Sequence, residues 1–258
     1  MGSALVEGIL RNGLCAETDI RASDVMPGAT EGLRARFPGI RVGTNAETVA
    51  GSQVVLLCVK PPDLIPTLEA VAGAGAGAEN PLYVSIAAGV PLARIEGALS
   101  SGGRAVRVMP NTPALIGKGA SAFALGSGCG PGDAEAVHAL LSAVGYAVAV
   151  PEKLLDAVTG VSGSGPAYVY AIIEALADGG VLMGIPKAEA LRLAAHTVAG
   201  AAEMVLQTGE HPAVLRDAVT SPGGTTIAAL AKLEDKGLRS ALIEAVRTAT
   251  EKASELGQ

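Results

Sequence analysis

The sequence predicts an α/β protein in which a doubly wound parallel sheet is followed by an all-α domain. Short apolar runs alternate with amphipathic helical patterns over residues 1–150, and this alternation is typical of a mostly parallel sheet with helices on both faces. From Pro151 onward the strand patterns stop and long helical periods replace them. We therefore expect a domain boundary near Pro151, with one domain over residues 1–150 and a second over residues 151–258.

The strand and helix patterns of the first half follow one another closely along the chain. After a helical pattern at residues 3–10, apolar runs predict strands at 20–25, 54–59, 82–87, 105–109, 120–125 and 146–150. Helices are expected between most of them, at 29–37, 64–71, 92–99 and 133–144. The Ala/Gly run over residues 72–78 has low complexity, and we expect it to form a surface loop.

The second half consists of helical patterns rich in Ala, Leu and Val. They predict helices at 152–158, 166–182, 187–206, 212–219, 225–233 and 239–256. The chain is 49% hydrophobic but only 2% aromatic, so much of its apolar surface is carried by small side chains. Such a surface favours close packing of helices, including packing between subunits.

Charge and composition exclude several classes of function. Acidic residues outnumber basic residues by 25 to 19 in the 258-residue chain and no long Lys/Arg cluster occurs, which argues against nucleic acid as a partner. The three cysteines have no metal-ligand spacing, as expected for a reduced, cytoplasmic protein without a metal site. Glu174 and Asp178 interrupt the apolar stretch at 167–183, so we expect no membrane span.

Residues that follow the predicted strands are the candidates for ligand binding, because open parallel sheets bind ligands beyond the carboxyl ends of their strands. Three turns stand there, and they include Lys60, Ala88 and Asn111. We expect Lys60 to contribute main-chain contacts from its turn. Asp24 closes the first strand, where a carboxylate can accept hydrogen bonds from a ribose 2′-hydroxyl and repel a 2′-phosphate. A solvated acid at a strand end is the alternative for Asp24.

A turn of small and hydroxylic residues precedes the last helix but one. Gly223 and Gly224 lack a Cβ atom, so the main chain there can bring its N–H groups close to a ligand. Ser221, Thr225 and Thr226 add hydroxyls at the N-terminal end of the helix, which favours an anion. The turn is suited to a carboxylate, and an ordinary Ser/Thr helix cap is the alternative.

One part of a dinucleotide-binding pattern is missing from the start of the sequence. A strand running into G-x-G-x-x-G is expected, but the sequence begins Met1-Gly2-Ser3, as though entered just before the third glycine. We expect either that the sequence is a fragment or a mis-started reading, or that its cofactor binding is impaired.

Several motifs together closely resemble the pyrroline-5-carboxylate reductase family, whose members catalyse the last step of proline synthesis. Each motif is weak alone, but their order and spacing over nearly the whole chain are highly specific. In chain order they are Val59-Lys60-Pro61, Ala87-Ala88-Gly89-Val90, Met109-Pro110-Asn111-Thr112-Pro113, Asp156 to Tyr168, Ala175 to Gly180 and Ser221 to Thr226.

The resemblance implies hydride transfer from NADPH or NADH to the imine carbon of 1-pyrroline-5-carboxylate, yielding L-proline. It also implies a Rossmann-like cofactor domain, followed by a helical domain that interlocks with a second subunit in a homodimer or in a larger homo-oligomer built on dimers. Asp24 favours NADH, whereas the neighbouring Ser23 could help to accept a phosphate.

The resemblance also implies roles for individual residues. Thr226 would be catalytic and would hydrogen-bond the ring nitrogen, while Ser221, Thr225 and the main chain at Gly223 and Gly224 would hold the substrate carboxylate. Glu152 matches a position that can approach the substrate, with a plain first-turn helix acid as the alternative. The implied cofactor contacts are Gly2, Ser23, Asp24, Asn45, Val59, Lys60, Pro61, Ala87, Ala88, Gly89 and Asn111. Some family members carry Asn near the nicotinamide where this chain has Ala218.

Two alternatives remain open. The β-hydroxyacid dehydrogenases share the two-domain plan and carry a catalytic lysine in G-x-x-G-x-G-x-x-x-K; this chain has Gly160, Gly163 and Gly165 in that spacing but Val169 in place of the lysine. Valine cannot assist proton removal from an alcohol. The other alternative is a non-catalytic dimerising paralogue that has lost cofactor binding, which the missing glycines favour and the intact ligand-binding turns oppose.

Overall fold

The computed structural model describes residues 1–74, 80–99 and 102–257 and divides the chain into two compact units. The first, here called the sheet unit, contains Met1–Ser164 and the chain from Thr248 onward. The second, the helical unit, contains Gly165–Arg247. The chain therefore leaves the sheet unit once and returns to it near its end.

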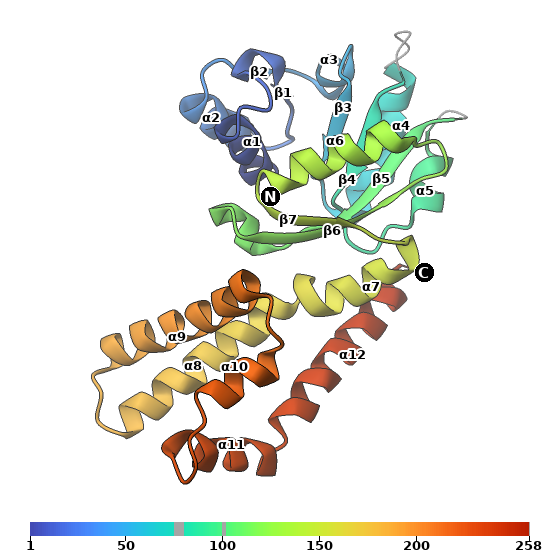
Figure 1. Cartoon of the computed structure of the whole chain (residues 1–258). Helices are drawn as coiled ribbons and strands as arrows, with labels where there is room; N and C mark the ends of the chain where they lie inside the picture. Colours follow the sequence, from blue (N-terminus) through green and yellow to red (C-terminus); the bar gives the residue numbers. More distant parts are fainter. Residues whose placement is uncertain (75–79, 100–101, 258) are drawn as a thin grey trace. The chain divides into compact units, whose positions relative to one another are not determined.

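Five strands form the main sheet, in the order β3-β4-β5-β6-β7 (Figure 1). Their bounds are β3 Val54–Leu57, β4 Leu82–Ser85, β5 Arg104–Met109, β6 Gly119–Leu125 and β7 Gly145–Ala149. All neighbours pair in parallel except β5 and β6. The short 3₁₀ helix η2 (Thr112–Ile116) lies between β5 and β6, and so short a connection permits only antiparallel pairing, because a parallel pair needs a long crossover. The predicted, mostly parallel sheet is confirmed, and this reversal was not anticipated.

A second, two-stranded parallel sheet pairs β1 (Arg21–Ala22) with β2 (Arg41–Val42). The sequence pattern predicted β1 within a longer strand but missed β2, whose two residues are both exposed and give no apolar run. It also missed the short helix α3 (Asn45–Val49), which begins with a reciprocal cap. In this cap the Thr44 N–H donates to Glu47 Oε2 over 2.7 Å, and the Glu47 N–H donates to Thr44 Oγ1 over 3.3 Å.

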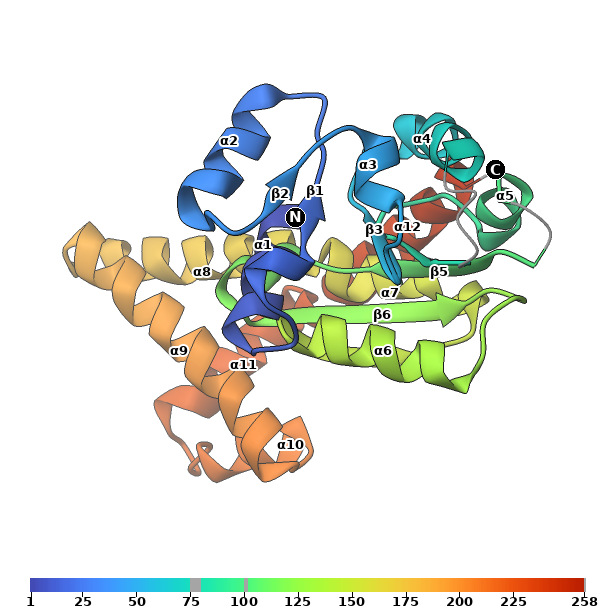
Figure 2. The same cartoon turned by 90° about the horizontal axis from the view of Figure 1, so that it is seen from above.

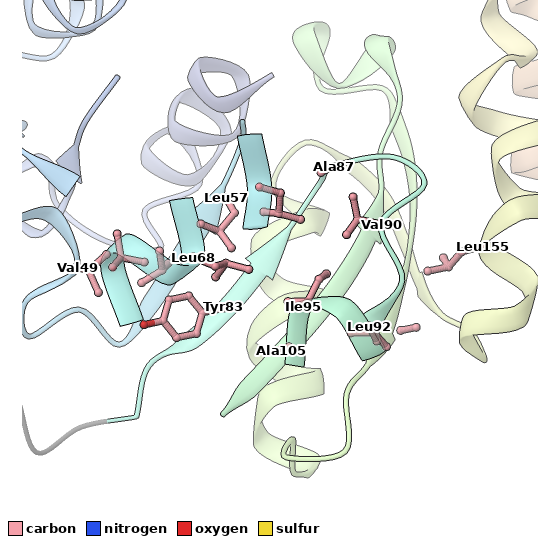
Figure 3. Packing of buried hydrophobic residues seen from close by; sticks show 14 of the residues in the cluster. Val49, Leu57, Leu68, Tyr83, Ala87, Val90, Leu92, Ile95, Ala105 and Leu155 are labelled. Carbon is pink, nitrogen blue, oxygen red and sulfur yellow. The ribbon is translucent and has the colours of Figure 1, made fainter. Parts of the chain in front are cut away.

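Helices cover both faces of the main sheet (Figure 2). On one face, α4 (Pro61–Ala74) and α5 (Leu92–Gly97) bury Leu64, Leu68 and Ile95 against the strands; Figure 3 shows this cluster from close by. On the other face, α1 (Gly2–Arg11) and α6 (Pro131–Ser142) pack around Phe123. The remaining helix of the first half is α2 (Pro27–Arg36). The Ala/Gly run predicted as a surface loop begins as the end of α4, and its remainder lies outside the described residues.

The stretch after Pro151 still packs on the sheet. It comprises η3 (Glu152–Leu154), α7 (Leu155–Val158) and the π-helix η4 (Thr159–Gly163). Leu155 is fully buried in the same cluster as Leu92 and Val90 (Figure 3). The compact units consequently divide after Ser164, later than the change in sequence pattern at Pro151, because this helical stretch buries its apolar side chains against the sheet.

The helical unit is built from α8 (Gly165–Leu182), α9 (Lys187–Thr208), α10 (Pro212–Ala218), α11 (Thr225–Asp235) and the first part of α12 (Leu238–Leu256). Small residues allow α8 and α9 to approach closely: Ala177, Ala190 and Ala194 are buried between them, and a Cβ at Gly180 would lie 3.1 Å from that of Ala190. Few large apolar side chains of this unit are buried, so most of its apolar surface is available to a partner.

Candidate active site

The loops that follow β3, β4 and β5 lie at one edge of the sheet, because these strands are parallel neighbours. Leu57 pairs with Ser85, and Ser85 pairs with Arg107. The structure therefore brings together the predicted cofactor residues Val59, Lys60 and Pro61 after β3, Ala87, Ala88 and Gly89 after β4, and Asn111 after β5. Pro61 is the first residue of α4, and Gly89 has a φ of 76°, a conformation that favours glycine.

Gly2 lies beside the first of these loops. It is the first residue of α1, and a Cβ placed on it would lie 3.3 Å from the Cβ of Cys58. A larger side chain at Gly2 would press on the end of β3. The N-terminal end of α1 is thus held close to the strand-end edge, as expected of a glycine near a dinucleotide phosphate.

Three further predicted cofactor residues lie at the ends of the two short strands. Ser23 and Asp24 follow β1, and Asn45 begins α3 after β2. The Ser23 hydroxyl donates to Asn45 Oδ1 over 2.7 Å, and Asp24 Oδ1 accepts the N–H of Met26 over 2.8 Å. Ser23 and Asn45 thus contact each other, and Asp24 directly follows Ser23 along the chain, so polar side chains suited to the hydroxyls of a ribose stand at these strand ends.

The cap that begins α3 fixes the start of the helix that carries Asn45. Hydrogen bonds from the main-chain N–H and the hydroxyl of Thr44 lower the pKa of Glu47. The same hydrogen bonds hold the start of α3, with Asn45 in its first turn, in place.

Two predicted site residues have side chains that are engaged within the sheet unit. Buried Asn111 donates through Nδ2 to the Ser162 carbonyl over 3.1 Å and accepts the Ala120 N–H at Oδ1 over 2.9 Å. A cofactor contact of Asn111 is therefore left to its main chain. Glu152 Oε1 accepts the Leu92 N–H over 2.7 Å and pairs with Arg107 over 3.3 Å. These contacts give Glu152 a structural role, and its contact with a substrate stays a prediction.

The hydroxylic turn lies in the helical unit, directly before α11. The Gly224 N–H donates to the Ser221 carbonyl over 3.0 Å, which closes the turn. Gly223 has a φ of 68°, and a Cβ on Gly224 would lie 2.4 Å from Ser221 Oγ, so both positions favour glycine. Gly224 is the N-cap residue and offers no side-chain cap. Ala218, where some relatives carry Asn, is the last residue of α10.

The side-chain hydroxyls of this turn, unlike its main chain at Ser221 and Gly224, have no partner among the described residues. The hydroxyls of Ser221, Thr225 and Thr226 make no hydrogen bond within the described part of the chain. The first N–H groups of an α-helix have no intrahelical acceptor, and here no side chain caps them. An ordinary Ser/Thr cap would use these hydroxyls on the helix itself. The turn is instead a set of unpaired donors at a positive helix end, which can bind a carboxylate.

Within the described ranges, no group of three or more His, Cys, Asp or Glu residues could hold a metal ion. None of the helices that the structure describes is long and apolar enough to span a bilayer.

Two families match separate parts of the chain. Residues 152–256 match the family described as "pyrroline-5-carboxylate reductase dimerisation". Residues 1–89 match the family described as "NADP oxidoreductase coenzyme F420-dependent". The first match covers the helical unit and the stretch that leads to it. The second covers α1 to β4 and the loop that follows.

Relatives and solved structures extend this similarity to the full length. A pyrroline-5-carboxylate reductase of Methanosarcina acetivorans is 48% identical over 259 residues, covering 100% of this chain and 95% of the relative. One of Synechocystis is 48% identical over 262 residues, covering 100% and 96%. The structure is similar to that of a pyrroline-5-carboxylate reductase of Coxiella burnetii, with a TM-score of 0.93, 32% identity and coverage of 99% and 94%. It is also similar to the Plasmodium falciparum pyrroline carboxylate reductase with NADP bound, with a TM-score of 0.87, 28% identity and coverage of 100% and 95%.

Proposed function

The chain belongs to the pyrroline-5-carboxylate reductase family, and from this premise we propose how its parts reduce 1-pyrroline-5-carboxylate to L-proline with NADPH or NADH. The observation that carries the proposal is the turn before α11, where three hydroxyls and the first helical N–H groups have no partner in the described chain. A small carboxylate is one of the anions that such a turn can bind.

The reaction requires the protein mainly to bind the substrate and the cofactor and to orient them. A bound reduced nicotinamide supplies the hydride. Thr226 hydrogen-bonds the ring nitrogen of the substrate, while Ser221, Thr225 and the main chain at Gly223 and Gly224 hold its carboxylate. These contacts fix the position of the imine carbon, and a protonated imine is already electrophilic, so no strong general base is needed.

The cofactor contacts come from the first part of the chain. We assign residues 1–150 to cofactor binding and residues 151–258 to dimerisation and substrate binding, an assignment that the match over 152–256 supports. The strand-end edge fits a dinucleotide, because Gly2 and Gly89 allow close approach of the main chain. The polar Ser23, Asp24 and Asn45 stand at the ends of the two short strands.

The choice between NADH and NADPH is expected to depend on the charge of Asp24. Asp24→Asn keeps an oxygen that can accept the Met26 N–H but removes the charge that repels a 2′-phosphate. The ratio of kcat/KM for NADH to kcat/KM for NADPH is expected to fall about fivefold. Asp24→Ala should lower the ratio similarly, and Asp19→Asn, which changes a carboxylate at η1 (Glu17–Asp19), should leave it unchanged. An unchanged ratio in both Asp24 variants would remove Asp24 from the cofactor site.

The helical unit is the part of the chain through which copies of the protein associate. The family's dimerisation domain spans residues 152–256, so the chain forms a homo-oligomer, and we propose a homodimer as its basic form. The exposed apolar side chains of the unit support this: Leu182 is 85% and Met183 81% exposed. The three cysteines are free thiols in the structure, in keeping with the cytoplasmic location that we also propose.

Charges on this surface are expected to weaken the assembly. Leu182→Glu combined with Met183→Glu should raise the dimer dissociation constant at least about tenfold, because each carboxylate would be desolvated in an apolar contact. Analytical ultracentrifugation over a range of protein concentrations measures the change. Ile116→Glu, on an equally exposed residue of η2 in the sheet unit, is the matched control and should leave the constant unchanged.

The test of the function itself is oxidation of NADH, and separately of NADPH, by the purified chain in the presence of 1-pyrroline-5-carboxylate. We expect turnover that requires both reactants and yields one proline for each cofactor oxidised. A parallel assay offers NAD⁺ or NADP⁺ with β-hydroxy acids. Turnover only in the second assay would contradict the proposed reaction and favour hydroxyacid chemistry.

A further inference from the structure

An ion cluster centred on one buried arginine lies in the sheet unit, and the proposed chemistry gives that arginine no role. Arg107 on β5 is only 8% exposed. Its Nη1 donates to Glu152 Oε1 over 3.3 Å and its Nη2 to Asp156 Oδ1 over 3.0 Å. One planar guanidinium thus holds two carboxylates in fixed directions, which a lysine could not do as rigidly.

Each of the two carboxylates also accepts a hydrogen bond from another element of the same unit. Glu152 Oε1 also accepts the Leu92 N–H at the start of α5, over 2.7 Å. Asp156 Oδ2 accepts the hydroxyl of Ser254, near the end of α12, over 2.9 Å. The cluster therefore joins β5, the start of α5, the stretch after Pro151 and the end of α12.

Two of these partners lie in the segments through which the chain crosses between the units. Asp156 belongs to α7, which precedes the exit from the sheet unit after Ser164. Ser254 belongs to the part of α12 that follows the return at Thr248. Asp156 bonds to Arg107 through one oxygen and to Ser254 through the other, so this one side chain links both crossing segments to Arg107 on the sheet.

We propose that Arg107 is a positioning residue: through Asp156 it fixes both crossing segments to the cofactor-binding sheet, and this anchoring sustains the rate of hydride transfer. The inference rests on the proposed function, because the sheet unit carries the cofactor contacts and the helical unit carries the substrate turn. Rates of hydride transfer fall steeply when the reacting atoms are misplaced by even about 1 Å. Loss of the contact between Arg107 and Asp156 therefore lowers turnover, although Arg107 itself does not touch the substrate.

The same strand supplies a matched control. Arg104, also on β5, donates through Nη1 to Asp133 Oδ1 over 2.7 Å. Asp133 is buried and belongs to α6, which does not lead into the helical unit. Arg104→Met therefore removes a similar ion pair from the same strand without touching a crossing segment, and both substitutions should lower the unfolding temperature.

The experiment compares Arg107→Met, Arg107→Lys and Arg104→Met by steady-state kinetics at a temperature where all three are folded. We expect Arg107→Met to lower kcat on the order of tenfold, with KM for NADH or NADPH within about twofold of the unsubstituted chain. Arg107→Lys should recover part of the loss, and Arg104→Met should keep the unsubstituted kcat. Equal kcat values for Arg107→Met and Arg104→Met would overturn the proposal. If the unsubstituted chain does not turn over, the proposed function fails instead.

Hydrogen exchange provides a second measurement that does not depend on activity. Ser254→Ala removes only the link between Asp156 and α12 and should fold even if Arg107→Met does not. We expect faster amide exchange at residues 249–257 in this variant, with exchange in α6 unchanged and kcat lowered about twofold. Unchanged exchange at 249–257 together with an unchanged kcat would overturn the proposal.

Discussion

Thr226→Val is expected to lower kcat for 1-pyrroline-5-carboxylate about 100-fold while KM for the nicotinamide cofactor stays within about twofold. Valine has nearly the same shape as threonine but no hydroxyl. In the described part of the chain the Thr226 hydroxyl has no partner, so its removal breaks no internal hydrogen bond and the loss falls on the contact with the ring nitrogen. Stopped-flow measurement of cofactor oxidation in a single turnover would show the loss in the hydride-transfer step itself.

Two controls separate this role from a general effect of the substitution. Thr226→Ser keeps the hydroxyl and should recover most of the rate. Thr197→Val makes the same change in α9 at a hydroxyl that already donates to the Leu193 carbonyl over 2.7 Å, and it should turn over at the unsubstituted rate. A Thr226→Val variant as active as the Thr197→Val variant would exclude Thr226 from the site.

Gly145→Ala is expected to destabilise the fold by about 3 kcal/mol or more. Gly145 begins β7 with a φ of 144°, and a Cβ there would lie 2.1 Å from the Gly119 carbonyl oxygen and 2.4 Å from the Gly119 nitrogen. These atoms belong to the main chain of β6, so they cannot move aside as a flexible side chain would. The new methyl group must separate the first residues of two paired strands. Urea unfolding at a fixed protein concentration measures the cost.

Gly132→Ala is the matched control for this substitution. Gly132 lies in the first turn of α6, and a Cβ on it would meet no atom within 4 Å. This variant should be more stable by about 0.5 kcal/mol, because alanine restricts the unfolded chain. If the two variants unfolded at the same urea concentration, the close approach of β6 and β7 would not limit stability.

The sequence allowed prediction of most helices and strands, because their apolar periods are strong and their burial follows from those periods. The prediction failed where an element is too short to show a period, as for β2 and α3. It also missed the antiparallel pairing of β5 and β6, since strand direction depends on the short connection through η2 and not on the pattern of either strand. The division of the chain after Ser164 depends on long-range packing that no local pattern records.

The candidate site was predictable to a similar degree. The hydroxylic turn and the strand-end loops are local, so residue types alone indicated them. The side-chain partners of Asn111 and Glu152 come from distant segments. The sequence around Asn111 and Glu152 has no pattern that predicts those contacts. Arg107 was overlooked although a signal existed: it is a charged residue inside the apolar run of β5, and such a residue in a buried strand requires oppositely charged partners.

The return of α12 to the sheet unit has a consequence for folding during synthesis. Every residue of the helical unit is translated before Thr248, where the chain comes back to the sheet. At about 5–20 residues per second, on the order of ten seconds pass between synthesis of Ser164 and synthesis of Thr248, where the last segment of the sheet unit begins. Until then the Asp156 carboxylate lacks the Ser254 hydroxyl. The domain that is made first is therefore completed last, and a ribosome stalled within α8 to α11 would hold an unfinished sheet unit.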